Sequence, residues 1–569
     1  MSTIFPEAMI DPISGKANRI LALFSLLVGI SFSFGHLAGM YYCGRSYTPL
    51  VYDQWMVRGV GSPKYFYALD HVAWDETAAY ARYAQEVLRG DFLGATLGSF
   101  EPYVKGEARA QSIWCRDRLG PILLAALSAP FGRSVPKAFV AADFLFPALT
   151  AFCLLLLCRQ LFPCLLLWLF AVSLAVWFSF FDLIGLLYLY WGDPHYGPIF
   201  ARTAYPQISC CFFALFLIAM LRLDRRRSIV SAAFLGFALL LNFYTYVYSW
   251  TLALAMLIVW LILLGSGLPF AGAENAGRRL LAAFIAVPAG LAAAASIPVW
   301  LPLAARPAAV QDFFVRLGGT ITRQPDWLAL LFCSLFAALA LGAGRRGWRN
   351  GWFWAVFWIA CFAVTNEQVI SGRTMQPFHY LLFFMGPFFP IFLCDIGYWR
   401  WSQSGLGKVL WRRAGLIVAG TVALGFAQCA FRLAQPVARE RELHTTDRSV
   451  DQVLAVLSMP GLRHEGFLTN DPLLDQILPA YVPQKPLQPW WMDPLGDSEI
   501  RALHLAAAHL LEEPIDYRAA HPGPSLRFDP AKTIVVCNRH RPIRIRAAAC
   551  QVLVSNDDFL VISLAPCGG

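Results

Sequence analysis

The sequence predicts a polytopic α-helical membrane protein that ends in a small α/β domain. The first observation is composition: of 569 residues, 58% are hydrophobic and 14% are charged, with a mean hydropathy of +0.53, whereas soluble domains carry about 25% charged residues. The second is that apolar runs of about 20 residues, the length that crosses a bilayer, recur up to residue 432. The third is that the basic residues behind the net charge of +10 cluster in short loops between these runs, which indicates membrane topology rather than nucleic-acid binding.

We expect about eleven transmembrane helices from these runs. They lie near 20–42, 136–157, 161–181, 206–221, 229–244, 248–265, 280–303, 327–344, 351–365, 380–397 and 415–432. The first run is too long for the apolar core of a signal peptide, so we expect an uncleaved first span. The stretches 161–205 and 229–265 also admit other divisions into spans.

Positive charge predicts the orientation of these spans. Basic segments occur at Lys16 and Arg19, at Arg159, and at 222–227, 278–279, 345–349 and 400–413. With eleven spans and a cytoplasmic N-terminus, all of them fall on the cytoplasmic side. We therefore expect a multi-pass protein of the bacterial inner membrane. Its periplasmic side would receive the polar loops 43–118, 182–205, 304–326 and 366–379 and the tail 433–569.

The chain is predicted to have two domains, 1–432 in the membrane and 433–569 outside it. In the tail, 447–457 has the pattern of an amphipathic helix, and 533–537 and 551–554 have the pattern of short strands. The segment 119–132 is too short to span and is expected at the membrane interface.

The cysteines and tyrosines suggest mostly structural roles. Most cysteines lie in apolar spans, where a free thiol behaves as a small hydrophobe. Cys43 with Cys115, and Cys537 with Cys550, lie in segments where an oxidising compartment would allow disulfides. The Tyr-rich stretch 242–248 is typical of an interfacial aromatic belt.

The first polar loop contains the most informative stretch of the chain. Asp75 and Glu76 precede a helical pattern with an apolar face, and Gly90 follows it as a C-terminal glycine does. Acidic side chains at a helix N-terminus contribute about 0.3–1 kcal/mol through the helix dipole, so stabilisation of the helix alone would explain them. Their expected place near the membrane surface favours a catalytic role at a lipid-borne substrate.

These residues resemble the first-loop signature of the GT-C glycosyltransferases, a family that includes the protein O-mannosyltransferases and the lipid A aminoarabinose transferases. The matching positions are Asp75-Glu76, Tyr80, Ala84, Gly90-Asp91 and Pro121. The order of elements matches through about Arg159. The chain departs from both named subfamilies in having Arg118-Leu119-Gly120-Pro121 where a Lys-Pro pair is expected before the interfacial helix.

The resemblance implies an activity. GT-C enzymes transfer a sugar from a polyprenyl-phosphate donor on the extracytoplasmic face, with inversion at the anomeric carbon. The family's first-loop Asp, here Asp75, would act as the general base on the acceptor hydroxyl, with Glu76 beside it. Because a lipid phosphate leaves, basic or amide groups must stabilise its charge.

Two other loops on the same predicted face carry candidate phosphate ligands. The second loop contributes Asp193, His195 and Arg202, and the fourth contributes Arg373 and His379. Polar groups concentrated at a span end are functional candidates by default. Asp193 is either a second acid or a metal ligand beside Asp75, because some GT-C enzymes need Mg or Mn and others do not.

The remaining signals are less specific. Asp143 and Asp182 lie in apolar runs near predicted periplasmic ends, where each would either snorkel to the interface or line a cavity. Arg306, Arg316 and Arg323 of the third loop would either attract the anionic donor or lie on the surface.

Two other functional classes compete with glycosyl transfer. One is a transporter or flippase of lipid-linked sugars, although the sequence lacks the repeats and paired broken helices common in transporters. The other is an O-antigen polymerase or ligase, although these usually carry their large loop late in the chain. The acceptor of a transferase would be a glycan, a lipid or a protein, and no pattern indicates nucleic acid.

Overall fold

The computed structural model describes residues 15–43, 76–88, 90, 119–178, 200, 206–266, 275–305, 320–374, 378–404, 407–439, 448–459, 462, 466–469, 474, 478, 482, 484–486, 533–539 and 551–563. The chain divides into two compact units. The first contains Met1–Phe34, Asp143–Ile297 and Gly318–Leu433, and the second contains Gly35–Ala142, Pro298–Leu317 and Ala434–Gly569.

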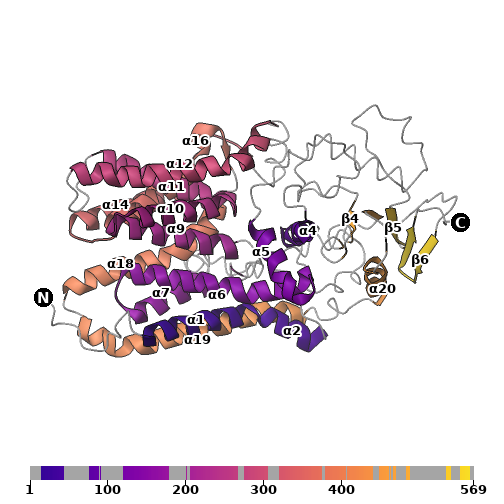
Figure 1. The fold of residues 1–569 in the computed structure, drawn as a ribbon. Coiled ribbons are helices and arrows are strands. Elements are labelled where there is room, and N and C mark those ends of the chain that lie inside the picture. Colours follow the sequence, from indigo (N-terminus) through magenta and orange to yellow (C-terminus); the bar gives the residue numbers. More distant parts are fainter. Residues whose placement is uncertain are drawn as a thin grey trace. The chain divides into compact units, whose positions relative to one another are not determined.

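Long apolar helices that run side by side form the first unit (Figure 1). Within the described residues, nine helical segments are long and apolar enough to cross a membrane, which confirms the predicted fold class. They fall on α1 (Gly15–Phe32), α6 (Val135–Leu161), α9 (Gln207–Arg225), α11 (Val247–Gly265), α12 (Asn275–Ala305), α14 (Trp327–Arg345), α15 (Gly351–Thr365), α18 (Gly386–Ser404) and α19 (Gly407–Arg439).

Two shorter apolar helices complete this unit. They are α7 (Leu165–Trp177), which packs against α18, and α10 (Ile229–Phe243), which packs against α9 and α11. The turns at 226–228 and 244–246 are short. Helix α10 therefore runs antiparallel to both α9 and α11 and lies beside them in the bundle. Adding α7 and α10 to the nine long segments gives one helical segment for each of the eleven apolar runs.

Helix starts in this unit follow ordinary capping chemistry. Asp326 precedes α14, and its Oδ1 accepts a hydrogen bond of 3.0 Å from the backbone N–H of Ala329. Ser228 precedes α10, and its Oγ accepts one of 3.2 Å from the backbone N–H of Ser231. Each bond satisfies one of the free N–H groups of the first helical turn.

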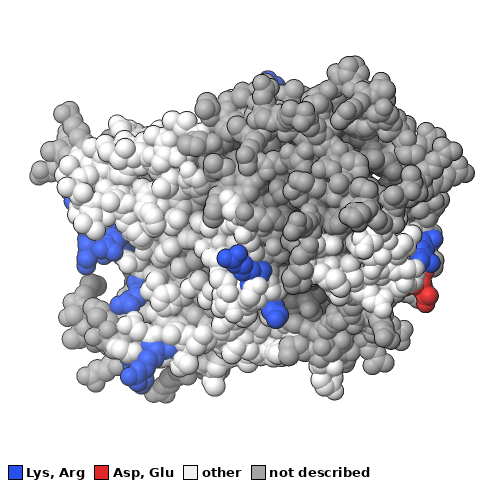
Figure 2. All heavy atoms as spheres, turned by 45° about the vertical axis from the view of Figure 1, so that its right-hand side comes forward, with Lys and Arg blue, Asp and Glu red and all other residues white. Residues whose placement is uncertain are grey.

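Most basic residues of the first unit lie at one end of its helices, which we call the basic end; Arg323 and Arg373 are exceptions. Arg159 near the end of α6 donates to Asn18 of α1 over 3.2 Å, and Arg225 at the end of α9 donates to Gln160 over 2.8 Å. In Figure 2, several groups of Lys and Arg atoms lie toward the left edge, and further groups lie near the centre and at the right edge, on an otherwise largely uncharged described surface. This clustering is the one expected for a cytoplasmic side.

A buried carboxylate connects four parts of the chain at the basic end. Asp395 of α18 is 2% exposed and accepts hydrogen bonds from Trp354 Nε1 (2.8 Å), Asn350 Nδ2 (3.0 Å) and Trp348 Nε1 (3.3 Å). Asn350 Nδ2 also donates to the carbonyl of Leu161 over 2.8 Å. We call these five residues the Asp395 cluster, and they fasten α6, the α14–α15 turn, α15 and α18 to one another.

Helices α14 and α15 approach each other closely where they leave their connecting turn. A Cβ added to Gly351 would lie 2.6 Å from the Cα of Gly344 and 2.7 Å from the carbonyl oxygen of Ala340. Only a residue without a side chain fits this backbone-to-backbone contact.

The second unit contains short helices and a mixed sheet. The helices are α2 (Phe34–Cys43), α4 (Glu76–Leu88), α5 (Leu119–Ser128), η4 (Ala129–Phe131) and α20 (Arg448–Leu457). The strands are β3 (Gly466–Thr469), β4 (Lys485–Pro486), β5 (Thr533–Asn538), β6 (Gln551–Ser555) and β7 (Phe559–Ser563), in the order β4-β3-β5-β7-β6. β3 pairs in parallel with β4 and β5, and β7 pairs antiparallel with β5 and β6.

The sheet and α20 confirm the predicted α/β character of the tail. α20 packs on β6 and β7 through the face that carries Val453 and Leu457, both fully buried. The two strands expected from the sequence are β5 and β6, while β3, β4 and β7 were not predicted. The antiparallel β6–β7 pair has a register shift between Val552 and Val554.

The described cysteines of the apolar helices behave as small core residues. Among the described cysteines that lie in expected spans, Cys211 and Cys394 are half-buried. The others are buried: Cys153, Cys158, Cys164, Cys210, Cys333, Cys361 and Cys429. Cys537 is buried in β5, whereas Cys115 and Cys550 lie outside the described residues. Both proposed disulfides therefore remain predictions.

Candidate functional site

The residues predicted to act on the substrate divide into those that the structure describes and those that it does not. Asp75, Asp193, His195 and Arg202 lie outside the described residues, as does Asp182. Glu76 and Arg373 have described backbones only, and His379 is described in full. Their roles remain predictions.

Glu76 is the first residue of α4, as the acidic pair at a helix start predicts. The buried face of α4 contains Tyr80, Ala81, Tyr83, Ala84 and Val87, and this helix packs against α5. Ala81 and Ala84 are fully buried, and small side chains allow two helices to approach closely.

Gly90 ends this element in the way that the sequence predicted. Its φ is +90°, which favours glycine, and its backbone N–H donates to the carbonyl of Val87 over 3.0 Å. The acidic residues before α4 and the glycine after it therefore mark a helix of defined length.

The third and fourth loops meet in a two-stranded ribbon at the end of the first unit opposite the basic end. β1 (Thr320–Ile321) pairs antiparallel with β2 (Arg373–Thr374), and Ile321 lies opposite Arg373. The chain reaches this ribbon through α16 (Gln368–Ser371) and Gly372, whose φ is +74°. The backbone of Arg373 is thus tied to the third loop.

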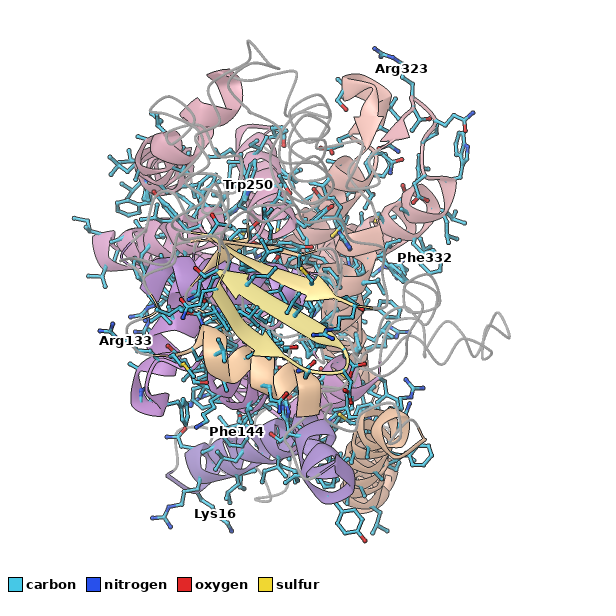
Figure 3. The ribbon with its side chains drawn as sticks, turned by 90° about the vertical axis from the view of Figure 1, so that its right-hand side faces the viewer. Lys16, Arg133, Phe144, Trp250, Arg323 and Phe332 are labelled. Carbon is cyan, nitrogen blue, oxygen red and sulfur yellow. The ribbon has the colours of Figure 1, made fainter. Side chains whose placement is uncertain are left out.

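Side-chain amides and one exposed cation reinforce the same two loops. Asn366 Oδ1 accepts from the backbone N–H of Asp326 over 2.9 Å, and Gln368 Nε2 donates to the carbonyl of Gln324 over 3.1 Å. Figure 3 shows Arg323 at the rim of the ribbon with its guanidinium pointing outward. This side chain is exposed, and its Nη1 donates to the backbone carbonyls of Val369 (3.4 Å) and Ile370 (3.5 Å).

His379 lies in a cluster of aromatic rings at the same end of the first unit. It belongs to α17 (Phe378–Tyr380), is 5% exposed, and stacks on Phe383 with ring centroids 4.9 Å apart. Tyr248 of α11 packs edge-on against His379 at 4.7 Å and against Tyr380 at 5.0 Å. The Tyr380 hydroxyl lies 2.8 Å from that of Thr251, so α11 and α17 together fix the imidazole.

This cluster corrects one interpretation of the sequence. Tyr246 and Tyr248 were expected in a lipid-facing aromatic belt, but they are only 5% and 4% exposed. The belt interpretation is wrong for both, because their rings pack on each other and around His379. Tyr248 and Thr251 are spaced so that both lie on one helix face. This spacing was the signal in the sequence that the two side chains pack inward together.

Asp143 lines the interior of the bundle instead of snorkelling. Its side chain is 4% exposed, and Oδ1 accepts a hydrogen bond of 3.1 Å from Gln207 Nε2. Gln207 itself was missed by the sequence analysis. Its position directly after Pro206, at the start of an apolar run, was the only signal.

Metal binding remains a proposal for this chain. Among the residues that the structure describes, no group of three or more His, Cys, Asp or Glu side chains is arranged to hold a metal ion. The proposed ligands Asp75 and Asp193 are not among those residues.

Comparison with known proteins finds similarity among solved structures only. The sequence matches no protein-family model and no curated protein. Among solved structures, the fold is similar to the archaeal oligosaccharyltransferase AglB from Archaeoglobus fulgidus, in complex with an inhibitory peptide and a dolichol-phosphate. That likeness has a TM-score of 0.42 and 11% sequence identity, and it covers 92% of this chain and 70% of that chain. The described helices by themselves define the class: a multi-pass helical membrane protein.

Proposed function

We propose that this protein is an integral membrane glycosyltransferase that moves a sugar from a polyprenyl-phosphate donor to an acceptor hydroxyl. The observation that carries the proposal is the first-loop stretch from Asp75 to Asp91, which resembles the GT-C signature. The helix expected within this stretch supports it, because α4 begins at Glu76 and is closed by Gly90.

The proposed reaction is a single inverting displacement. The Asp75 carboxylate takes the proton of the acceptor hydroxyl while the acceptor oxygen forms its bond to the anomeric carbon. The bond between that carbon and the phosphate oxygen breaks, and polyprenyl phosphate leaves with the electron pair. Glu76, the next residue in the sequence and the first residue of α4, is proposed to support the base.

The leaving phosphate needs positive charge and hydrogen-bond donors around it. We propose Arg202 and His195 of the second loop and Arg373 and His379 of the fourth loop for this task. The β1–β2 pairing ties Arg373 to the third loop, and the ring cluster fixes His379. Both residues belong to the end of the bundle that lacks the basic clusters, which supports a shared role.

A divalent ion is an optional part of this proposal. If Asp75 and Asp193 hold Mg or Mn, the ion would neutralise charge on the donor phosphate. The steps assigned to the protein's own residues are the same with or without it.

The same proposal includes the location of the reaction. Because Lys and Arg favour the cytoplasmic side, the basic end is proposed to face the cytoplasm of a bacterium. The α4 region, the fourth loop and the C-terminal domain would then face the periplasm, where lipid-linked sugars meet glycan, lipid or protein acceptors.

Mass spectrometry of cell-envelope glycans tests this function in cells. Cells that lack the protein should lose one sugar from a surface glycan, glycolipid or glycoprotein. Wild-type protein should restore that sugar, whereas Asp75→Asn, expressed at the same level in the membrane, should not. An unchanged glycan profile in cells without the protein would contradict glycosyl transfer and favour the flippase alternative.

A further inference from the structure

Gln207 joins two helices and a loop at the end of the first unit opposite the basic end. It is the first residue of α9 and is fully buried. Its Nε2 donates to Asp143 Oδ1 over 3.1 Å and to the carbonyl of Phe200 over 2.7 Å. The Thr150 hydroxyl donates to the Gln207 carbonyl over 2.8 Å. One residue therefore connects α6, α9 and the loop that precedes α9.

Helix α6 provides the fixed side of this connection. Asp143 and Thr150 are seven residues apart in α6, which places them on the same face two turns apart. Both are buried, at 4% and 0% exposed. A carboxylate is costly to bury unless it has a specific partner, and the Gln207 amide is such a partner.

Phe200 is the residue of the second polar loop that Gln207 contacts. Its carbonyl accepts from Gln207, and its side chain is fully buried, so the chain is held there at two points. Phe200 belongs to the second polar loop, two residues before Arg202 and five residues after His195. Phe200 is therefore the described anchor point of this loop that lies nearest in the sequence to both residues.

The Gln207 amide uses its N–H donors and not its acceptor in the described part of the chain. Its Oε1 atom is buried and has no hydrogen-bond partner in the described part of the chain. A buried acceptor without a partner is destabilising, so an apolar side chain of similar size would serve simple packing better. The donors must contribute something that packing does not, and their two targets are Asp143 and the loop carbonyl.

We infer that Asp143 and Gln207 are positioning residues that hold the second loop in place to bind the donor phosphate. The inference rests on the proposed function for the identity of the ligand. The anchoring of the loop through Phe200 is a separate physical claim, which can be measured without any substrate.

Hydrogen exchange of the full-length protein in detergent tests the anchoring. Gln207→Leu removes both N–H donors and should raise amide exchange across peptides of 195–206 by about tenfold, the effect expected for losing roughly one hydrogen bond's stabilisation. Asp143→Leu should act in the same direction. Asp143→Asn keeps an acceptor oxygen for Gln207 and should stay near wild type.

Thr150→Val is the matched control for these variants. It removes a buried hydrogen bond between the same two helices, but one that does not reach the loop. It should leave exchange in 195–206 unchanged. If Gln207→Leu left exchange in this loop at the wild-type level, or if Thr150→Val raised it equally, the inference would be overturned.

Kinetics with a polyprenyl-phosphate sugar donor distinguish positioning from general structural damage. Gln207→Leu should raise the KM for the donor about tenfold and change kcat by about twofold or less, because donor binding is weakened while the base is untouched. An equal fall in kcat with unchanged KM would contradict the assigned role. A wild-type protein that transfers no sugar would refute the proposed function, while the exchange result would still decide whether the loop is anchored.

Discussion

At the scale of single residues, Asp395 shows how one carboxylate organises an end of the bundle. It is almost fully buried and is surrounded by N–H donors from Trp348, Asn350 and Trp354. Removing this acceptor would leave buried N–H donors without a partner, and each such donor costs about 1–3 kcal/mol. The cluster is therefore expected to make a large contribution to stability without taking part in chemistry.

We predict that Asp395→Leu lowers the free energy of unfolding by about 3 kcal/mol or more, because the N–H donors of Trp348, Asn350 and Trp354 lose their common acceptor. Asp395→Asn should also destabilise the protein, because its amide group would face the N–H donors of Trp354 or Asn350. Thermal unfolding in detergent, followed by tryptophan fluorescence, measures both. Asp326→Asn is the control, since Asn and Asp are equivalent helix caps and the change should be under about 0.5 kcal/mol. A melting temperature for Asp395→Leu equal to that of the control would contradict this account.

The sequence alone did not predict this cluster, for a physical reason. Asp395 lies in an apolar run, and its donors come from positions 41–47 residues earlier. Periodicity shows which face of a helix is apolar, but it does not show which distant residues meet there. The same limit applies to Gln207 and to the tyrosines around His379. The start of α4 at Glu76 and its end at Gly90 could be predicted because their signals are local.

At the scale of elements, the α14–α15 hairpin depends on a close contact of two backbones. We predict that Gly351→Ala destabilises the protein by about 1–3 kcal/mol, because the new methyl group would overlap the backbone of α14. Gly342→Ala in α14 is the matched control, since a Cβ there meets nothing within 4 Å. Thermal unfolding of the two variants measures the difference. Equal stability of both variants would show that the helices can separate at no cost.

Elements with strong periodicity could be predicted, and short elements held by distant partners could not. α4, α20, β5 and β6 were all expected near their observed bounds. By contrast, β1 and β2 contain two residues each, and they form only because 320–321 and 373–374 are brought together. A segment that short carries no pattern of its own, so the ribbon that joins the third and fourth loops was not foreseen.

At the scale of the whole molecule, the proposed transferase and a transporter make different demands on the basic end. Alternating access needs helices to separate at each end in turn. At the basic end, the Asp395 cluster joins α6, α15 and α18, and Arg225 joins α9 to Gln160 of α6. A transferase whose chemistry lies at the opposite end has no need to break these contacts.

A cross-link at the basic end tests this distinction. Gln160→Cys and Arg225→Cys, joined by a short bifunctional maleimide, should hold α6 and α9 together at that end. We predict that the cross-linked protein transfers sugar at the rate of the same variant before cross-linking. The controls are the two variants that carry only one of the two introduced cysteines, treated with the same reagent. Loss of activity only in the cross-linked double variant would indicate that the basic end must open.

The central claim is that Asp75 is the base of a polyprenyl-phosphate-dependent sugar transfer, and one assay tests it most directly. Purified wild-type protein and Asp75→Asn would be reconstituted in liposomes with a labelled polyprenyl-phosphate sugar and an envelope extract from cells that lack the protein. We predict that the wild type forms a labelled product and releases polyprenyl phosphate. Asp75→Asn should unfold at the wild-type temperature yet transfer sugar at least about a hundredfold more slowly. Transfer by Asp75→Asn at the wild-type rate would contradict the account.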